Sequence, residues 1–308
     1  MTVRKLRMAK TRPRLPVWFR TRLPTGELQR KFNETKNTVT DKTLHTVCQE
    51  ARCPNIHECW AAKDATFMVA GQECTRTCKF CAVGSVKIPP PLDENEPNNL
   101  AEAVATMDLN HAVITVVNRD DLPDSGAAHY RKCLEAVRKR SPDVSLELLC
   151  SDLAGDHDAL ADLLVGLELD VFAHNVECVP RLDLRVRDRR ASFTQSIGIL
   201  KEAKRLRPDI FTKSSIMVGL GETDEEITEA LRMLKQAGVD LVTIGQYLAP
   251  SPKHLPVDRF PEPSRYDEWS TQIEEIGFSG WACGPLVRSS YKAGELLARA
   301  SARLRTEK

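Results

Sequence analysis

The chain has 308 residues, 42% of them hydrophobic, and a formal net charge of +1. The apolar content is sufficient for a buried core, while the nearly balanced charge excludes strong electrostatic attraction to nucleic acid or to a membrane surface. No apolar run approaches the roughly 20 residues that a membrane-spanning helix needs, and ten cysteines are too sparse for a disulfide scaffold. We therefore expect neither nucleic acid nor a membrane among the partners.

The first 26 residues contain eight Lys or Arg residues and no Asp or Glu. A transit peptide, a nucleic-acid-binding arm and a solvated basic tail all fit this composition. Transit peptides form Ser- and Arg-rich amphipathic helices, but this stretch has no serine, and its prolines Pro13, Pro16 and Pro24 interrupt any helix. We interpret it as a solvated basic arm that helps to hold an acidic partner.

Two cysteine triplets follow. The first has the spacing C-x4-C-x5-C and the second C-x3-C-x2-C, and their members are Cys48, Cys53, Cys59 and Cys74, Cys78, Cys81. A structural zinc site normally closes with four ligands, whereas a [4Fe–4S] cluster held by three thiolates leaves one iron open to a small molecule. A zinc knuckle and a redox dithiol are the alternatives for the second triplet. The first triplet needs a fourth ligand from elsewhere in the chain.

From Thr66 onwards, short apolar runs alternate with segments of helical periodicity. The predicted strands are Thr66–Val69, Ala112–Val117, Val144–Leu149, Asp170–Ala173, Phe211–Val218 and Leu241–Ile244. The predicted helices between them are Leu100–Met107, Ala127–Lys139, Ala159–Leu167, Gln195–Leu206 and Glu225–Ala237. Alternating strands and helices favour a parallel sheet with right-handed crossovers. Six units rather than eight predict an α/β fold, an open (β/α)6 partial TIM barrel with N-terminal and C-terminal extensions.

Polar or glycine residues follow every predicted strand at its carboxyl end. The second cysteine triplet follows the first strand, Asn118 follows the second and Asn175 the fourth. Barrels of this kind carry their chemistry at this end, where the loops after the strands converge. Asn175 can both donate and accept hydrogen bonds, as a pair of ribose hydroxyls requires, although a strand-end cap explains it equally well. We therefore predict the active site at this end of the barrel.

The second triplet, with Phe80 just before its last cysteine, resembles the signature of the radical SAM superfamily. The chain also resembles the lipoyl synthase family, from about Pro16 to Glu295, in its two triplets, in the runs Cys-Pro-Asn-Ile-His-Glu-Cys-Trp and Thr-Ile-Gly-Gln-Tyr-Leu, and in Arg288-Ser289-Ser290-Tyr291. This resemblance implies two [4Fe–4S] clusters and S-adenosylmethionine (SAM). It also implies that Ser290 completes the cluster on the first triplet.

The same resemblance implies contacts to SAM. It places Asn175 at the ribose, Asn118 at the methionyl end and Arg187 near SAM or the substrate. It also places a sequence element along the adenine of SAM, and the matching positions of this adenine element are Ser215, Met217, Gly219 and Glu222. The family has Asp where Asn118 stands and Ser where Val116 stands.

The implied activity is insertion of two sulfur atoms at C6 and C8 of an octanoyl group bound as N6-octanoyl-lysine to a carrier protein, giving the lipoyl cofactor. Radicals derived from SAM remove the hydrogen atoms, and the cluster on the first triplet donates the sulfur. The implied partners are octanoylated E2 subunits of 2-oxo acid dehydrogenases, the glycine cleavage H protein, and reduced flavodoxin or ferredoxin as electron donor. Labile clusters and free thiols favour a reducing compartment, and we expect a cytoplasmic protein.

Three other functions stay open: sulfur insertion into a small molecule, as in biotin synthase; methylthiolation of RNA or protein; and electron transfer or sensing by a non-catalytic two-cluster protein. We expect three parts in the chain. They are an extension with the first triplet (residues 1–62), the radical SAM partial barrel (63–280) and a tail with the serine motif (281–308).

Overall fold

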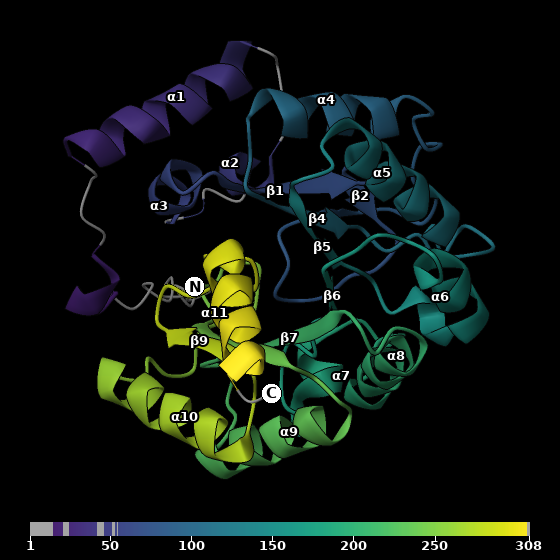
Figure 1. Ribbon diagram of the computed structural model, residues 1–308. Helices are drawn as coiled ribbons and strands as arrows, with labels where there is room; N and C mark the ends of the chain where they lie inside the picture. The colour runs from purple at the N-terminus through teal and green to yellow at the C-terminus, as the bar shows by residue number, and fades with distance from the viewer. Residues whose placement is uncertain (1–14, 21–24, 42–45, 51–52, 54, 307–308) are drawn as a thin grey trace, which may run out of the picture.

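The computed structural model describes residues 15–20, 25–41, 46–50, 53 and 55–306 (Figure 1), so most of the predicted basic arm lies outside the described residues. The described start of the chain forms a short 3-10 helix, η1 (Val17–Phe19). Its Phe19 ring lies edge-on to Phe260, with the ring centroids 5.7 Å apart. This contact fastens the described N-terminal segment to a loop near the other end of the chain.

Seven parallel strands form the main sheet, in the order β1-β4-β5-β6-β7-β8-β9. Their bounds are β1 Asp64–Val69, β4 His111–Val116, β5 Ser145–Leu149, β6 Val171–Ala173, β7 Phe211–Val218, β8 Leu241–Gln246 and β9 Gly280–Gly284. The two edge strands β1 and β9 are not paired with each other, so the barrel is open. The predicted α/β fold with an open partial barrel is confirmed.

The predicted number of strands is wrong by one, because β9 was not foreseen. Its sequence, Gly-Trp-Ala-Cys-Gly, has glycine at both ends and no β-branched residue, so it carries no local strand signal. It becomes a strand by pairing along β8, from Leu241 opposite Gly280 to Gly245 opposite Gly284. The sheet thus continues past residue 280, where the predicted barrel ends. The division of the chain into three parts stays a prediction.

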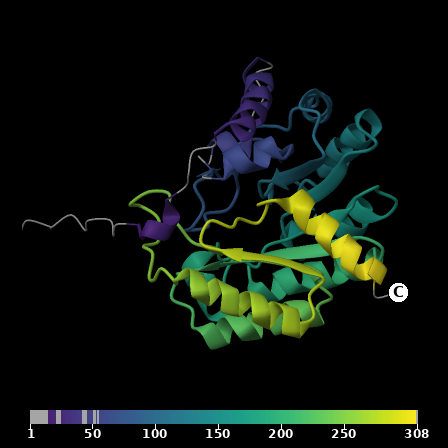
Figure 2. The same ribbon diagram turned by 60° about the vertical axis from the view of Figure 1, so that its left-hand side comes forward.

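Helices cover the outer face of the sheet (Figures 1 and 2). They are α4 Glu96–Thr106, α5 Ala127–Arg140, α6 His157–Leu164, α8 Phe193–Leu206, α9 Asp224–Gln236 and α10 Pro263–Ile276. The first five confirm the predicted helices with shifts of a few residues at their ends, whereas α10 was not predicted. Helix α9 begins with a capping box, in which Thr223 and Glu226 each accept a hydrogen bond from the other's backbone N–H.

Shorter elements lie in the loops at the carboxyl ends of the strands. They are the helix α7 Asp183–Val186, the 3-10 helices η2 Leu153–Gly155 and η3 Pro180–Leu182, and the small parallel pair β2 Glu73–Cys74 and β3 Gly84–Ser85. None of the helices in the described part of the chain has the length and apolar character needed to traverse a bilayer.

The N-terminal helices α1 (Glu27–Asp41), α2 (Val47–Glu50) and α3 (Ile56–Ala61) lie beside the β1 edge of the sheet (Figure 1). Trp60, only 1% exposed, stacks on Phe32 of α1 with ring centroids 5.8 Å apart. This stacking joins α1 to α3, and both rings belong to the same apolar core as Ala65 and Phe67 of β1.

Helix α11 (Ala293–Thr306) crosses the barrel at the amino ends of the strands, in the foreground of Figure 1. A Cβ at Gly294 would lie 2.9 Å from the His111 Cβ and 3.0 Å from an Asp64 oxygen, so the close approach of α11 requires glycine there. The active end of the barrel is on the opposite side.

A buried ion pair lies inside the barrel. Lys213 of β7 donates two hydrogen bonds of 2.8 Å to the carboxylate of Glu147 on β5, and both side chains are 1% exposed. The ring of His111 approaches the same carboxylate at 3.7 Å. The pair crosses the barrel interior over the intervening strand β6 and fixes the spacing of these strands.

Candidate active site

The first cysteine triplet lines a cavity of about 20 Å³, called here the small cavity. Ser290, which lies more than 230 residues after Cys53 in the chain, lines the same cavity, and Ser289 is not among its lining residues. The structure therefore brings together the four residues that the resemblance implied for the second cluster; the members of this set are Cys48, Cys53, Cys59 and Ser290.

Two hydrogen bonds fasten the serine segment to the triplet. Asn55 Nδ2 donates to the Leu286 carbonyl at 2.6 Å, and the Tyr291 hydroxyl donates to Glu58 at 2.7 Å. These bonds lie on either side of Ser290 in the sequence. The tail is thus held against α3 at the cavity, and the hydroxyl of Ser290 is delivered by a segment that is fixed at both ends.

Burial makes the small cavity unfavourable for thiolates. It raises the pKa of Cys59 to about 12 and raises the pKa of Cys48. Arg288 also lines the cavity; its guanidinium donates to the Val287 carbonyl at 2.7 Å and, among the described residues, has no carboxylate partner. A bound cation would remove the penalty on the thiolates, as metal ligation does for cysteine.

The second cysteine triplet lines a much larger cavity, of about 260 Å³, at the carboxyl ends of the strands. We call it the large cavity. Of the residues predicted to contact SAM, it is lined by Asn118, Asn175 and Arg187. Loops that follow β1, β4, β6 and the helix α7 deliver these groups to one place, although they are separated by up to about 110 residues in the sequence.

The two cavities occupy successive layers of one barrel. On β1, Thr66 lines the small cavity and Met68 the large one; on β4, Val113 lines the small cavity and Thr115 the large one. Residues two apart in a strand point to the same face, so both cavities are inside the barrel and the large one is nearer to its carboxyl end. A molecule that enters the large cavity therefore approaches the first triplet from the carboxyl ends of the strands.

A buried arginine holds the second cysteine loop to two other loops. Arg76, 4% exposed, donates at 2.7 and 2.9 Å to Asp120 in the loop after β4 and at 2.6 Å to Asp152 in the loop after β5. Burial opposes the ionisation of Asp152, but the Arg76 guanidinium outweighs it and keeps the pKa of this carboxyl below its usual value. No signal in the sequence indicated this network, because its three members come from three separate loops.

The segment after α7 closes on the same loop. Asp188 accepts from the backbone N–H of Thr77 at 2.9 Å, its own N–H points to the Cys78 sulfur at 3.3 Å, and Arg190 donates to the Thr75 carbonyl at 2.6 Å. A side-chain hydrogen bond from Arg190 lowers the pKa of Asp188. The loop with the second triplet is therefore rigidly placed.

Arg187 is buried and belongs to a chain of hydrogen bonds along the wall of the large cavity. It donates to the Ser196 hydroxyl at 2.9 Å; the hydroxyl lies 2.8 Å from His174 Nε2, and His174 Nδ1 lies 2.9 Å from the Cys150 carbonyl. Because a carbonyl only accepts, Nδ1 carries the proton and Nε2 accepts from Ser196. Burial lowers the pKa of His174 to about 4, so this histidine is neutral at pH 7.

The predicted adenine element does not line the large cavity with its side chains. Ser215 accepts a hydrogen bond from Thr243 at 2.8 Å, and Glu222 accepts from the backbone N–H groups of Gly219 at 2.7 Å and Leu220 at 2.8 Å. Met217 meets the site through its backbone: its N–H donates to the carbonyl of Glu177, a residue that does line the cavity. The element thus borders the site without contributing side chains to it.

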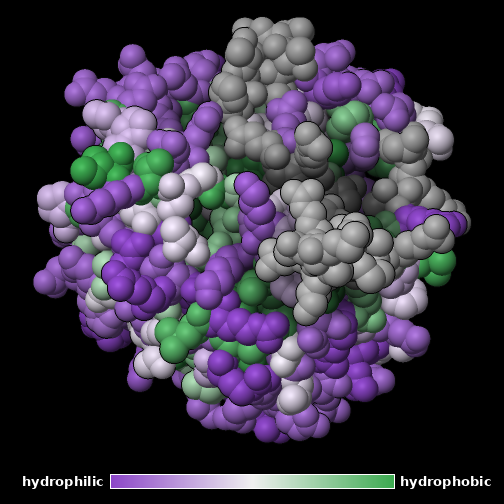
Figure 3. Space-filling view, turned by 180° about the vertical axis from the view of Figure 1, so that it is seen from behind, coloured by the Kyte–Doolittle hydropathy of each residue, from purple (hydrophilic) through white to green (hydrophobic). Residues whose placement is uncertain are grey.

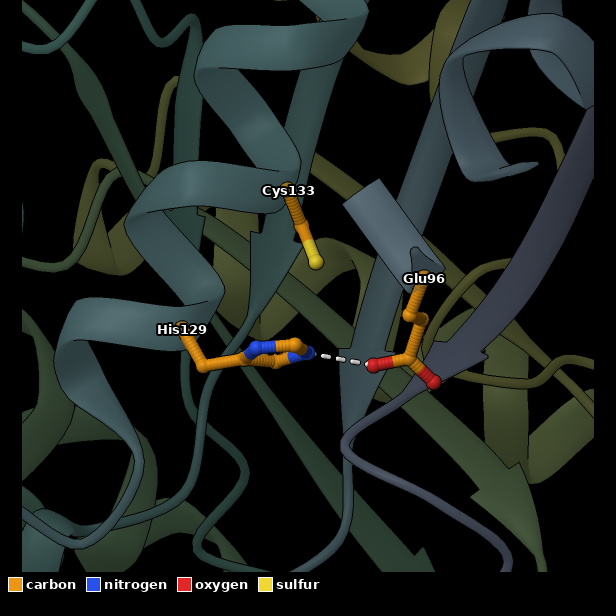
Figure 4. Close-up of side chains that lie close together, drawn as sticks. All are labelled: Glu96, His129 and Cys133. Carbon is orange, nitrogen blue, oxygen red and sulfur yellow. Dashed lines mark hydrogen bonds and ion pairs between the residues drawn. The ribbon is translucent and has the colours of Figure 1, made fainter. Parts of the chain in front are cut away.

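A further contact controls the start of the second cysteine loop. Ala70, just after β1, has a left-handed backbone with φ +69°. Its N–H donates to Glu96 at 2.8 Å, and its carbonyl accepts from Arg119 at 3.3 Å. Glu96 also bonds to His129 Nε2 at 2.5 Å, with the Cys133 sulfur beside the pair (Figure 4). These contacts stabilise a strained backbone four residues before Cys74.

Solved structures with this fold confirm the architecture. The chain superposes on methylornithine synthase with a TM-score of 0.54, over 90% of this chain and 96% of that one, at 12% identity. It superposes on Streptococcus suis SuiB bound to its precursor peptide with a TM-score of 0.56, over 77% and 53% of the two chains, at 10% identity. At such identities these likenesses establish the fold alone.

Curated relatives match nearly the whole chain. It is 48% identical to the mitochondrial lipoyl synthase of Bos taurus over 92% of this chain and 77% of the relative, and 49% identical to the chloroplastic lipoyl synthase of Arabidopsis thaliana over 92% and 72%. The expectation of a cytoplasmic location is wrong by this comparison, because the relatives are named for mitochondria and chloroplasts. A reducing environment for thiols and clusters also exists inside organelles, so the cysteine argument could not distinguish them.

Two family profiles match different parts of the chain. The radical SAM superfamily matches residues 68–245, which contain the second triplet and most of the sheet. The N-terminal domain of lipoyl synthase matches residues 2–53, which contain the basic arm and the first two cysteines of the first triplet. Together with the full-length relatives, these matches show that the chain belongs to the lipoyl synthase family of the radical SAM superfamily, the enzymes that insert sulfur into a carrier-bound octanoyl group.

Proposed function

We propose that the two cavities divide the work of lipoyl formation. In the large cavity the three thiols of the second triplet hold a [4Fe–4S] cluster that faces SAM; in the small cavity the first triplet and Ser290 hold the other cluster. When bound, the cluster in the large cavity and SAM would supply a radical that removes hydrogen from an unactivated carbon. The cluster in the small cavity would supply the sulfur. The observation that carries this proposal is the meeting of Ser290 with the first triplet in one cavity.

The donor sets fit these two groups. The small cavity offers three thiols and one hydroxyl, which make four ligands, and burial leaves the thiols in need of a positive partner. A hydroxyl oxygen is a poorer match than a thiolate for the soft iron of a cluster, so we expect Ser290 to bind less firmly than the cysteines. Ser290 would therefore release its iron more readily than a fourth cysteine would.

The residues around the second triplet bind and orient SAM in this proposal. Asn118 faces the methionyl group and Asn175 the ribose, while Arg187, held by Ser196, carries the only full charge among these three. The backbone at Met217 and Gly219 borders the adenine. Apolar side chains in the same cavity, Met68, Phe80 and Val83, exclude water and stray hydrogen donors from the acyl chain.

The substrates are carrier proteins that bear the octanoyl group, as for the family. We propose that this chain accepts the E2 subunits of 2-oxo acid dehydrogenases and the glycine cleavage H protein, with reduced flavodoxin or ferredoxin as electron donor. Incubation of each octanoylated carrier with the purified enzyme, followed by mass measurement of the lysine-containing peptide, tests this set. A carrier whose peptide gains no sulfur is removed from it.

Two cysteine variants test the division of work. Cys78→Ala should abolish the formation of 5′-deoxyadenosine, because the thiol beside SAM is lost. Cys53→Ala should still form 5′-deoxyadenosine but should give no thiolated octanoyl-lysine, because only the small cavity is altered. Anaerobic incubation with SAM, dithionite and an octanoyl-lysyl peptide, with chromatography of both products, measures this. Undiminished SAM cleavage by Cys78→Ala would contradict the assignment.

Adjacent serines provide a matched pair for the fourth ligand. Ser290→Ala should keep SAM cleavage but lose most of the doubly thiolated product, whereas Ser289→Ala should retain full yield, because Ser289 does not line the cavity. Ser290→Cys should assemble both clusters, counted by iron and sulfide analysis, yet transfer sulfur slowly because the thiolate holds its iron firmly. Full yield from Ser290→Ala would remove the ligand role.

A further inference from the structure

Four exposed residues, three of them basic, lie on the two segments that contribute Cys78, Phe80 and Arg187 to the wall of the large cavity: Lys79, Leu184, Arg185 and Arg189. We call these four residues the basic rim. All four are exposed, and Leu184 is 78% exposed, the same fraction as the most exposed large apolar side chains described. Lys79 lies between Cys78 and Phe80, which both line the cavity. Arg185 and Arg189 each lie two residues from Arg187, which also lines it, and Leu184 is next to Arg185.

The basic rim is one rigid unit with the cysteine loop. The backbone N–H of Lys79 donates to the Val186 carbonyl at 2.9 Å, and its ammonium reaches the Leu184 carbonyl at 3.4 Å. The Asp188 N–H points to the Cys78 sulfur at 3.3 Å. Any molecule that binds to the rim is therefore held at a fixed position relative to the second triplet.

The charge of the basic rim is not neutralised within the described chain. Neither Arg185 nor Arg189 has a hydrogen bond or ion pair with any described residue. Neighbouring arginines differ: Arg181 pairs with Glu226 at 2.6 Å and Arg190 with Asp188 at 2.9 Å. Two arginines that lie beside an active-site mouth without acidic partners keep their full charge for a partner outside the chain.

Two acidic side chains of the same segment are already engaged, and the Asp258 carboxyl, which approaches Gly221 from beside Arg185, forms no ion pair with that arginine in the described structure. Asp183 accepts from the Phe193 N–H at 2.6 Å and faces Arg187 at 3.7 Å. Asp188 accepts from Thr77 and Arg190. Seen from the side opposite α11, the described surface is mostly hydrophilic, with small apolar patches between the charged groups (Figure 3). An exposed leucine among unpaired arginines has the composition of a protein interface, where arginine and apolar anchors are enriched.

We propose that the basic rim docks an acidic face of the carrier protein, so that its octanoyl-lysine enters the large cavity. This inference rests on the proposed function. The partner follows from geometry and charge. The acyl chain must enter the large cavity, so the carrier surface around its lysine must lie against the basic rim. The unpaired arginines favour carboxylates on that carrier surface. Leu184 supplies an apolar contact at the centre of this surface. Complementary charge raises the association rate and fixes orientation.

The test compares two substrates that share one reaction. An octanoylated carrier domain contacts the rim, whereas a short, uncharged octanoyl-lysyl peptide reaches the large cavity without it. With the double variant Arg185→Glu/Arg189→Glu, we expect kcat/KM for the carrier to fall about tenfold or more, mainly through KM, and the peptide reaction to stay within about twofold of the unmodified enzyme. Added salt should weaken the unmodified enzyme's reaction with the carrier and leave the peptide reaction unchanged.

Controls separate docking from other effects. Arg232→Glu, a charge reversal at an exposed site of α9, should leave both substrates unaffected. Leu184→Ala should lower kcat/KM for the carrier only. If the double variant processes the carrier as well as the unmodified enzyme does, or loses both substrates equally, the docking role is overturned. If the unmodified enzyme thiolates neither substrate, the proposed function fails and the docking inference fails with it. That outcome is distinct from a failure of docking alone, in which the unmodified enzyme thiolates both substrates.

Discussion

Replacing Arg76 by methionine removes the cation that joins three loops around the second triplet. The side chain is 2% exposed and makes ion pairs at 2.7 Å with Asp120 and at 2.6 Å with Asp152. Methionine has a similar length and no charge, so the change leaves the volume nearly filled. Asp120 keeps a second arginine, Arg190, at 3.2 Å, but Asp152, 1% exposed, loses its only cation within the described structure.

The magnitude follows from this asymmetry. Breaking a buried ion pair by removing one partner typically costs about 3–5 kcal/mol, because an uncompensated charge is left behind. We expect about 3 kcal/mol for Arg76→Met, since Asp120 retains a partner and Asp152 still accepts from Gln195 at 2.8 Å. For a chain of 308 residues this corresponds to a melting midpoint lower by about 5 °C. The stability difference between Arg76→Met and the unmodified protein should shrink at acid pH. Arg76 holds the pKa of Asp152 below its usual value of 3.8, and protonation of Asp152 below that pH removes the benefit of the ion pair.

The assay is circular dichroism of the cluster-loaded protein during anaerobic heating, with iron content measured before and after. The matched control is Arg140→Met, which breaks an ion pair with Glu102 in which both side chains are more than half exposed. Such exposed pairs contribute about 0–1 kcal/mol, so this midpoint should move by less than about 2 °C. A midpoint for Arg76→Met no lower than that of Arg140→Met would refute the reasoning.

Three further predictions use the same melting assay. Lys213→Met should lower the midpoint by about 5–8 °C, because Glu147 is left charged inside the barrel, and Glu147→Gln in the same chain should restore most of the loss; no restoration would contradict the pairing. Ala70→Gly should raise stability by about 1 kcal/mol, since φ +69° is strained for alanine; a lower midpoint would contradict this. His174 has a pKa of about 4 when folded and an ordinary value of 6.5, so stability should fall as pH falls between these values, and His174→Gln should flatten that slope, by at most about 1.4 kcal/mol per pH unit; an unchanged slope would exclude the assignment.

The sequence alone determined those features that depend on neighbouring residues. The spacing of Cys74, Cys78 and Cys81 indicates a three-thiolate cluster loop because all three ligands lie within eight residues. The strand Phe211–Val218 was predicted at its observed bounds, since its apolar end Ile216-Met217-Val218 is followed by Gly219. The capping box of Thr223 and Glu226 fixed the start of α9 in the same way. Each of these signals is local, and local propensity and tertiary structure agree there.

Only the tertiary structure decided which distant groups meet. Ser290 lines one cavity with Cys53 because α3 and the tail are hydrogen-bonded; the resemblance had indicated Ser290, but no local signal places it beside the first triplet. Strand β9 exists because β8 offers it a pairing edge, and Arg76 is buried because two aspartates from other loops neutralise it. Pairings of charge and of backbone between remote segments leave no periodicity in the sequence, since their free energy comes from contacts that form only after the chain has folded.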